Sequence, residues 1–225
     1  MVKTSLRRPR SKLKPAEIEQ FFARLAATTP DPKTELQYSN AYTLLVAVVL
    51  SAQATDVGVN RATRRLFELA DHPAAMVALG EELVRDLIKS IGLYNTKAKN
   101  VIALSQALLA GHGGAVPNDR EALEALPGVG RKTANVVLNI MFGADTCAVD
   151  THIFRVGNRT GLAPGTTPRA VEDVLNAVMP PPYRRHAHHW LILHGRYTCI
   201  ARKPQCWRCP VIDLCRYQPK NLHPG

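Results

Sequence analysis

The sequence predicts an all-α protein whose helices are joined by short connectors. Apolar residues recur at three- and four-residue steps along most of the 225 residues, which is the period of a helix with one buried face. No segment sustains the alternation of apolar and polar residues that is typical of a half-buried strand. Glycine and proline interrupt the pattern at most of the expected helix ends. A chain of this length can form one large domain or two modest ones.

The expected helices follow one another from Pro15 onward. The first begins at Pro15 and ends before Thr28, with its apolar residues on one face. The segment 42–50 is apolar almost all round and is typical of a buried helix, although its β-branched valines leave a strand open. Further helices are expected at 57–70, 80–90, 95–110, 119–125, 131–142, 151–160, 168–178 and 185–196.

The charge of the chain indicates a polyanionic partner. The formal net charge is +11, and the first 14 residues carry six Lys or Arg and no acid. Such a basic leader is typical of a disordered tail that attracts phosphates without reading sequence, and a targeting segment is the alternative. No run is long and apolar enough to span a bilayer, and the start lacks the apolar stretch of a secretory signal. We therefore expect an intracellular protein.

Four cysteines close the chain within 17 residues, in the order C-x6-C-x2-C-x5-C. Thiolate sets of this kind hold tetrahedral zinc or an iron–sulfur cluster. Zinc ribbons usually show two close CxxC pairs, and only one is present here, so the spacing favours a [4Fe–4S] cluster. Zinc stays open as an alternative, whereas disulfides fit an intracellular chain poorly. The four residues are Cys199, Cys206, Cys209 and Cys215.

A tight hairpin is expected between the helices 119–125 and 131–142. Asn118 and Asp119 can cap the first helix, and Pro127 to Gly130 form the turn. Two glycines let the backbone approach another chain closely, and the free N–H groups at the start of the second helix can bind a phosphate. An ordinary helix–turn–helix connection is the alternative, and the overall charge favours binding to the DNA backbone.

Lys132 and Asp150 are the candidate catalytic pair. Lys132 comes directly after the hairpin, where a lysine is usually a phosphate contact, and Asp150 comes just before a helix, where an aspartate is usually a cap. The functional interpretation makes Lys132 a nucleophile and Asp150 a carboxylate that moves protons and stabilises positive charge on a sugar. An amine attacks only when it is neutral, and the neighbouring Arg131 and helix N-terminus favour that form.

Three stretches in one order resemble the endonuclease III family of DNA glycosylases. They are 126–134 (LPGVGRKTA), 149–153 (VDTHI) and the cysteine loop, and the likeness extends to 50–56, 91–95 and 188–199. The resemblance covers about residues 15 to 217. The basic leader and Cys147 fall outside it.

The resemblance implies two all-helical lobes with DNA bound in the cleft between them. One would be a six-helix domain, 34–143, which carries the helix-hairpin-helix motif. The other would be an iron–sulfur domain, 1–33 and 144–225. The family likeness also implies that the four cysteines hold a [4Fe–4S] cluster. Between the first two cysteines, Arg202 and Lys203 would contact phosphates.

By the same resemblance the enzyme is a bifunctional glycosylase and AP lyase that excises oxidised pyrimidines in base excision repair. A damaged base must leave the stack before it can be attacked. Lys132 would then attack the sugar, displace the base and form a Schiff base, Asp150 would assist, and β-elimination would cut the strand. Gln53 and Leu93 would fill the gap and wedge the opposite strand. The other expected DNA contacts are Gly128, Gly130, Arg131, Thr133 and His152.

The partner that the resemblance implies is double-stranded DNA containing oxidised pyrimidines or abasic sites. We expect a monomer that does not bind membranes and that lies in the cytoplasm, associated with the nucleoid. The rival hypothesis is a non-catalytic DNA-binding protein that uses the hairpin for backbone contact and a zinc loop for stability. That protein would bind DNA without regard to lesions, with a steep dependence on salt.

Overall fold

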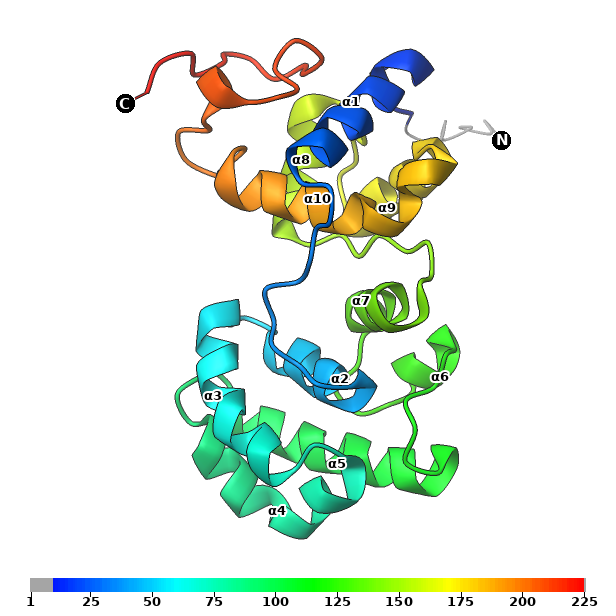
Figure 1. Ribbon diagram of the computed structural model, residues 1–225, viewed down its shortest axis with the longest axis vertical. Helices are drawn as coiled ribbons and strands as arrows, with labels where there is room; N and C mark the ends of the chain where they lie inside the picture. Colours follow the sequence, from blue (N-terminus) through cyan, green and yellow to red (C-terminus); the bar gives the residue numbers. More distant parts are fainter. Residues whose placement is uncertain (1–9, 225) are drawn as a thin grey trace, which may run out of the picture. The chain divides into compact units, whose positions relative to one another are not determined.

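The computed structural model describes residues 10–224 and confirms the all-α prediction. It contains ten α-helices and two short 3₁₀ turns, and residues 10–224 contain no strand. The chain divides into two compact units (Figure 1). The first, here called the terminal unit, consists of Met1–Lys33 and Asp145–Gly225, and the second, the central unit, of Thr34–Ala144. None of the described helices is long and apolar enough to cross a membrane.

The helices have the following bounds. The central unit contains α2 (Ala41–Leu50), α3 (Asp56–Leu69), α4 (Pro73–Ile88), α5 (Tyr94–His112), α6 (Arg120–Glu124) and α7 (Arg131–Phe142). The terminal unit contains α1 (Pro15–Thr28), α8 (Thr151–Thr160), α9 (Pro168–Val178), η1 (Pro181–Tyr183), α10 (Arg184–Tyr197) and η2 (Cys206–Arg208).

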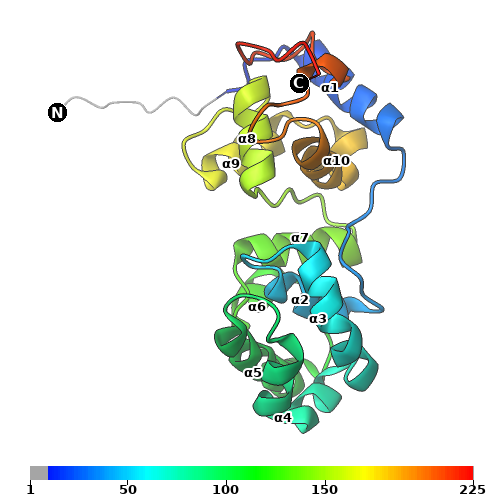
Figure 2. The same cartoon turned by 90° about the vertical axis from the view of Figure 1, so that its left-hand side faces the viewer.

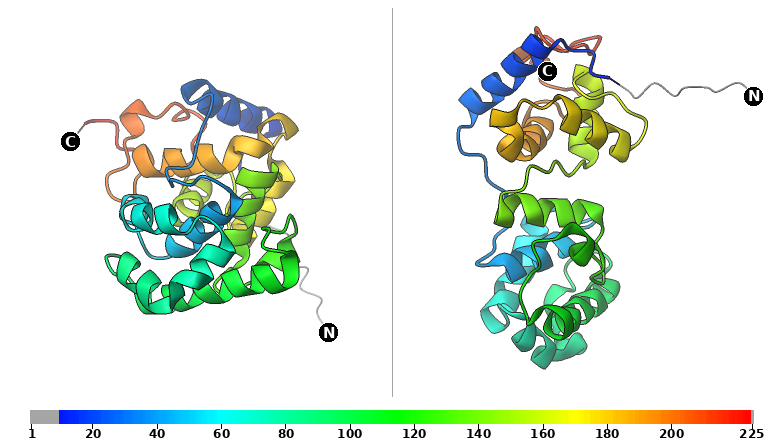
Figure 3. Two further views of the ribbon diagram at one scale, coloured as in Figure 1. Left: turned by 60° about the horizontal axis from the view of Figure 1, so that its bottom comes forward. Right: turned by 90° about the vertical axis from the view of Figure 1, so that its right-hand side faces the viewer.

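Helix α2 forms the centre of the central unit. Every residue of α2 after Ala41 is buried, and the helix packs against α3, α5 and α7. Asn40 caps it by accepting a bond from the Thr43 N–H at 2.9 Å. The apolar residues on every side of this segment reflect its complete burial as a helix. The alternative of a strand, which its β-branched valines left open, is wrong. Helices α4 and α5 pack along each other beneath this core (Figure 3).

Helix α4 begins seven residues earlier than the sequence predicts. Its first turn follows His72, whose imidazole Nδ1 accepts from the Ala75 N–H at 3.2 Å, and Pro73 occupies the first helical position. Gly80, the expected start, has φ 76° and ψ 161° and makes a break inside the helix. The expected start at residue 80 is therefore wrong, because the helical segment on the N-terminal side of this break belongs to the same element.

The terminal unit is built around α1, α8, α9 and α10. Phe21 and Phe22 of α1 are fully buried, and Trp190 of α10 donates its indole N–H to the Thr29 carbonyl at 2.7 Å. Helix α1 lies beside the C-terminal loop in both views (Figures 1 and 2). Two residues of that loop, Val211 and Leu214, belong to the same buried cluster. The cysteine loop is therefore packed onto the core of this unit.

Helices α8 and α10 come closest at Gly195. A Cβ atom added to Gly195 would lie 2.8 Å from the His152 Cβ and 3.2 Å from the His152 carbonyl oxygen. Contacts this short are not tolerated without movement of one helix. Gly195 therefore sets the spacing between α10 and the first turn of α8.

We expect Gly195→Ala to destabilise the protein by about 2 kcal/mol, because the added methyl group overpacks the α8–α10 contact. Thermal unfolding of the protein measures the effect. Gly111→Ala is the matched control, since Gly111 lies in α5 with no atom within 4 Å of the added Cβ, and the change should be neutral or stabilising. Equal melting temperatures for Gly195→Ala and the parent protein would contradict the close contact.

Candidate functional site

The hairpin between α6 and α7 begins from a capped helix. The Asp119 carboxylate accepts from the Ala122 N–H at 2.8 Å, which confirms the predicted cap. The turn closes with a bond from the Val129 N–H to the Leu126 carbonyl at 3.1 Å, and both side chains are buried. The buried side chains of Leu126 and Val129 thus hold the hairpin against the central unit, while its two glycines stay exposed.

The two glycines have different tasks. Gly128 has φ 76°, and an added Cβ would lie 2.9 Å from the Asn100 side chain of α5, so no other residue fits without strain. Gly130 is the N-cap of α7 in an extended conformation, and no side chain caps the helix there. The Arg120 Nε donates to the buried Asn135 at 3.1 Å and ties α6 to α7.

Lys132 is exposed on the first turn of α7. Its neighbours Arg131 and Thr133 are half-buried, and from Ala134 to Asn139 the helix is buried against the unit. The first N–H groups of the helix, with their partial positive charge, therefore lie at the same end as the exposed lysine. This arrangement provides an amine next to a binding place for a phosphate.

Three described residues other than glycine have a positive φ angle. They are Gln53 (54°), Leu93 (59°) and Lys203 (51°), and each is exposed. A residue with a side chain costs about 1–3 kcal/mol in this region, and such strain is concentrated at functional sites. Gly92 would place a Cβ 4.0 Å from the Gln53 carbonyl oxygen, so the loops of Gln53 and Leu93 are neighbours within the central unit. For all three residues the sequence predicts contact with DNA.

Asp150 is the N-cap of α8. Its Oδ1 accepts from the His152 N–H at 2.9 Å and from the Ile153 N–H at 2.8 Å. The interpretation of Asp150 as a helix cap is therefore confirmed, and one carboxylate oxygen accepts both bonds. His152 is half-buried on the same turn and lies 3.2 Å from the Arg155 guanidinium. Asp150 and Lys132 lie in different units.

Two arginines of α8 hold the backbone at the first cysteine. Arg155 donates to the Cys199 carbonyl at 2.9 Å and to the Gly195 carbonyl at 2.7 Å. Arg159, one turn further, donates to the Ile200 carbonyl at 2.7 Å and the Ala201 carbonyl at 2.8 Å. The helix that begins at Asp150 is thereby joined to the cysteine loop by four charge-assisted bonds.

The four cysteines fit an iron–sulfur cluster. Burial raises the pKa of Cys209 to about 11 and raises that of Cys215, and neighbouring cysteines add to both shifts. Thiolates in such a place need a compensating positive charge, which cluster iron supplies. Three nitrogen atoms also lie within bonding distance of sulfur: the Arg159 Nη1 is 3.8 Å from Cys199, the His194 Nε2 is 3.7 Å from Cys209 and the Tyr217 backbone nitrogen is 3.5 Å from Cys215.

A single metal ion and an iron–sulfur cluster place different demands on the positions of their ligands. Within residues 10–224, no group of three or more His, Cys, Asp or Glu side chains is placed to hold one ion. A zinc ion needs its four ligands about 2.0–2.3 Å from one point. A cluster takes one thiolate on each iron and does not require the sulfurs to meet at one point.

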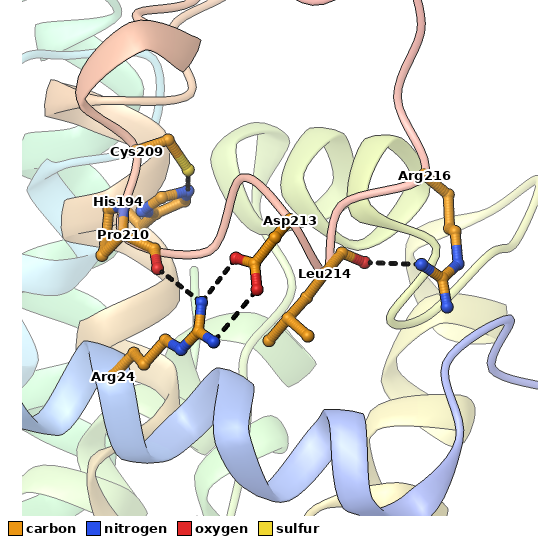
Figure 4. A network of polar contacts seen from close by, with 7 residues as sticks. All are labelled: Arg24, His194, Cys209, Pro210, Asp213, Leu214 and Arg216. Atoms are coloured by element: carbon orange, nitrogen blue, oxygen red, sulfur yellow. Dashed lines mark hydrogen bonds and ion pairs between the residues drawn. The ribbon is translucent and has the colours of Figure 1, made fainter.

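The second half of the loop is held from two sides (Figure 4). On one side, Arg24 of α1 donates to the Pro210 carbonyl at 3.2 Å and to both carboxylate oxygens of Asp213, one of them at 3.0 Å. On the other side, His194 of α10 faces the Cys209 sulfur. The segment between the third and fourth cysteines is therefore fastened to both helices.

The sequence analysis missed the residues that support the loop, namely Arg24, Arg155, Arg159, His194 and Gly195. The spacing of Arg155 and Arg159 is the one available signal, because residues four apart on a helix share a face. Nothing in the chain pairs that face with a loop 40 residues away.

Comparison with known proteins agrees with this geometry. Residues 46–181 match the model of the HhH-GPD superfamily base excision DNA repair protein, and residues 199–215 match the iron-sulfur binding domain of endonuclease III. The chain is 59% identical over 201 residues to endonuclease III of Escherichia coli K12, covering 89% of this chain and 95% of that protein. It is 57% identical over 198 residues to endonuclease III of Treponema pallidum, covering 88% and 94%.

Solved structures show the same likeness. The structure of a trapped endonuclease III–DNA covalent intermediate matches with a TM-score of 0.85 and 43% identity, over 91% of this chain and 96% of that one. A non-covalent endonuclease III–DNA complex matches with the same TM-score, identity and coverage.

The glycine hairpin and the helices around it thus define a base excision DNA repair protein of the HhH-GPD superfamily. Within that superfamily the chain belongs to the endonuclease III family. It is therefore a DNA glycosylase with AP lyase activity, and it carries a [4Fe–4S] cluster. The alternative of a non-catalytic protein with a zinc loop is not supported.

We expect Arg155→Lys to destabilise the protein by roughly 3 kcal/mol, because an ammonium cannot reach the Cys199 and Gly195 carbonyls together and one buried carbonyl loses its donor. Thermal unfolding of the purified holoprotein, followed by its visible absorbance, measures the loss. Arg65→Lys is the control, since Arg65 is exposed and pairs with Glu68 one turn away on the same helix. A stable Arg155→Lys protein with full absorbance would show that these bonds are dispensable.

Proposed function

We propose that this protein excises oxidised pyrimidines from double-stranded DNA and cuts the strand at the resulting abasic site, with Lys132 as the nucleophile. The observation that carries the proposal is the exposed amine on the first turn of α7, directly after a glycine hairpin whose helix start has no side-chain cap. A similar protein, endonuclease III, has been trapped in a covalent intermediate with DNA. A lysine that forms a Schiff base is the simplest source of such a bond.

The DNA backbone would be bound by the hairpin. The N–H groups at the start of α7 can donate hydrogen bonds to a phosphate oxygen, and Gly128, Gly130, Arg131 and Thr133 surround them. In the terminal unit, His152 and the exposed Arg202 and Lys203 supply further contacts. The central unit is then the helix-hairpin-helix domain and the terminal unit the iron–sulfur domain of a monomer that works on nucleoid DNA.

Gln53 and Leu93 would replace the extruded nucleotide. An amide can meet the base left without a partner, and an apolar side chain 57% exposed can enter the stack. Their left-handed backbone supports this role, because strain that the free protein already bears does not have to be added on binding.

The chemistry follows from the amine. The neutral Lys132 nitrogen bonds to the sugar C1′ while the bond from C1′ to the base breaks, and the base leaves with a proton. The C1′–O4′ bond of the sugar then breaks, the ring oxygen takes a proton, and a C1′=N iminium forms. The iminium acidifies the C2′ hydrogen. Removal of that proton expels the 3′ phosphate oxygen by β-elimination. Hydrolysis of the imine then restores the amine.

Asp150 would balance the positive charge that develops on the sugar. Its Oδ1 accepts both cap bonds, so the carboxylate is already fixed at the start of α8 in the protein without DNA. A fixed negative charge stabilises a cationic sugar better than a mobile one, because no energy is spent on orienting it during the reaction.

We expect Lys132→Ala to lose both base release and strand cleavage on a duplex with an oxidised thymine, by at least about 1000-fold in rate, because the covalent route is lost. Sodium borohydride should trap a protein–DNA adduct with the parent protein and none with the variant. Lys99→Ala, at an exposed position of α5, is the control and should trap normally. Trapping by Lys132→Ala would show that another amine is the nucleophile.

Two substitutions of Asp150 separate its cap from its charge. Asparagine can accept the same two N–H bonds, so Asp150→Asn should keep its melting temperature while base release slows roughly 100-fold or more. Asp150→Ala should lose the same activity and in addition about 1 kcal/mol of stability. Single-turnover base release and thermal unfolding measure the two effects. If Asp150→Asn keeps its activity, the carboxylate acts only as a cap.

A further inference from the structure

His194 is a buried side chain that the proposed reaction does not use. It lies in the last turn of α10, is 6% exposed, and holds its Nε2 3.7 Å from the Cys209 sulfur (Figure 4). The ring is fixed in place by its surroundings, since α10 packs against both α1 and α8. Its neighbour Gly195 is the point where α10 and α8 touch.

The chemistry of the pair determines which atom is the donor. A cysteine sulfur bonded to iron has no proton to give, so the imidazole must supply the hydrogen through Nε2–H. Both the neutral ring with its proton on Nε2 and the cationic ring can do so. The contact is therefore an N–H···S bond to one corner of the cluster.

A bond of this kind affects the cluster electrically. Hydrogen bonds to the sulfurs are among the factors that set the reduction potential of an iron–sulfur cluster. Reduction adds one electron, and part of its charge falls on the ligand sulfurs. An N–H aimed at a sulfur stabilises the reduced state more than the oxidised state. It therefore makes the reduction potential more positive.

We propose that His194 sets the reduction potential of the [4Fe–4S] cluster by donating a hydrogen bond to the Cys209 thiolate. The hydrogen bond stabilises the reduced form of the cluster more than its oxidised form, so the cluster becomes harder to oxidise. Arg159 at Cys199 and the Tyr217 N–H at Cys215 act in the same direction on two other corners. The Arg159 guanidinium also donates to the Ile200 and Ala201 carbonyls, and the Tyr217 donor is a backbone N–H. His194 contacts the sulfur through its side chain, so it can be replaced without removing a bond to the loop backbone.

The test is the midpoint potential of the holoprotein, measured by film voltammetry with one electron exchanged with the electrode. His194→Leu should shift the potential to more negative values, and His194→Gln, which retains an N–H at a similar reach, should restore at least half of that shift. His186→Leu, on the first turn of the same helix against Trp190, is the matched control and should leave the potential unchanged. An unshifted potential in His194→Leu overturns the proposal.

A second measurement avoids the risk that the leucine variant assembles no cluster. Protein labelled with ¹⁵N in its histidine rings is reduced with dithionite, and pulsed EPR of the paramagnetic cluster is recorded. A ¹⁵N coupling that is present in the parent protein and lost in the His194→Gln variant, with its remaining histidines labelled in the same way, supports the bond, and its absence from the parent protein overturns it. The proposal depends on Cys209 being a ligand, which is tested separately: a Cys209→Ser protein with unchanged visible absorbance would refute the ligand assignment and overturn the proposal with it.

Discussion

The hydrogen bonds from α8 to the end of α10 and the cysteine loop are the constraint on which the rest of the terminal unit depends. Arg155 and Arg159 bind four carbonyl groups between Gly195 and Ala201, the stretch in which α10 ends and the loop begins. Carbonyls at a helix end have no partners within the helix, and a buried one without a donor is costly. The two guanidinium groups supply these donors, and they do so from the helix whose N-cap is Asp150. Any displacement of the loop would therefore also act on α8.

This coupling has a geometric limit at Gly195. Helix α10 can lie against the first turn of α8 only because no side chain stands between them. The same turn carries His152, which contacts Arg155, and it follows directly on Asp150. A cluster that fixes the loop thus also fixes the position of the carboxylate. Under the proposed role of Asp150, the cluster would contribute to the active site through packing and hydrogen bonds, and it would need no part in the chemical steps at the sugar.

The sequence predicts well what local rules decide. The expected helices 131–142, 151–160 and 168–178 coincide with α7, α8 and α9, because a glycine or a capping side chain marks each start, namely Gly130, Asp150 and Thr167. The start of α4 was predicted wrongly since the non-helical Gly80 lies inside the helix and not at its beginning. The four cysteines were equally clear, because a set of soft ligands at short spacing has few other uses.

Contacts across the chain were beyond this kind of reasoning. No local pattern joins His194 to Cys209, or Arg24 to a carboxylate 189 residues away, because such pairs depend on how helices pack. The left-handed backbone of Gln53 and Leu93 was equally hidden, since neither side chain prefers that region. That conformation carries information of a different kind. Residues that pack a core are chosen for low strain, so strain at exposed residues persists only if something other than stability maintains it. Under the proposed contact of these residues with DNA, binding to a distorted duplex is such a cause, and it would account for strain at exposed loops of both units and not in their cores.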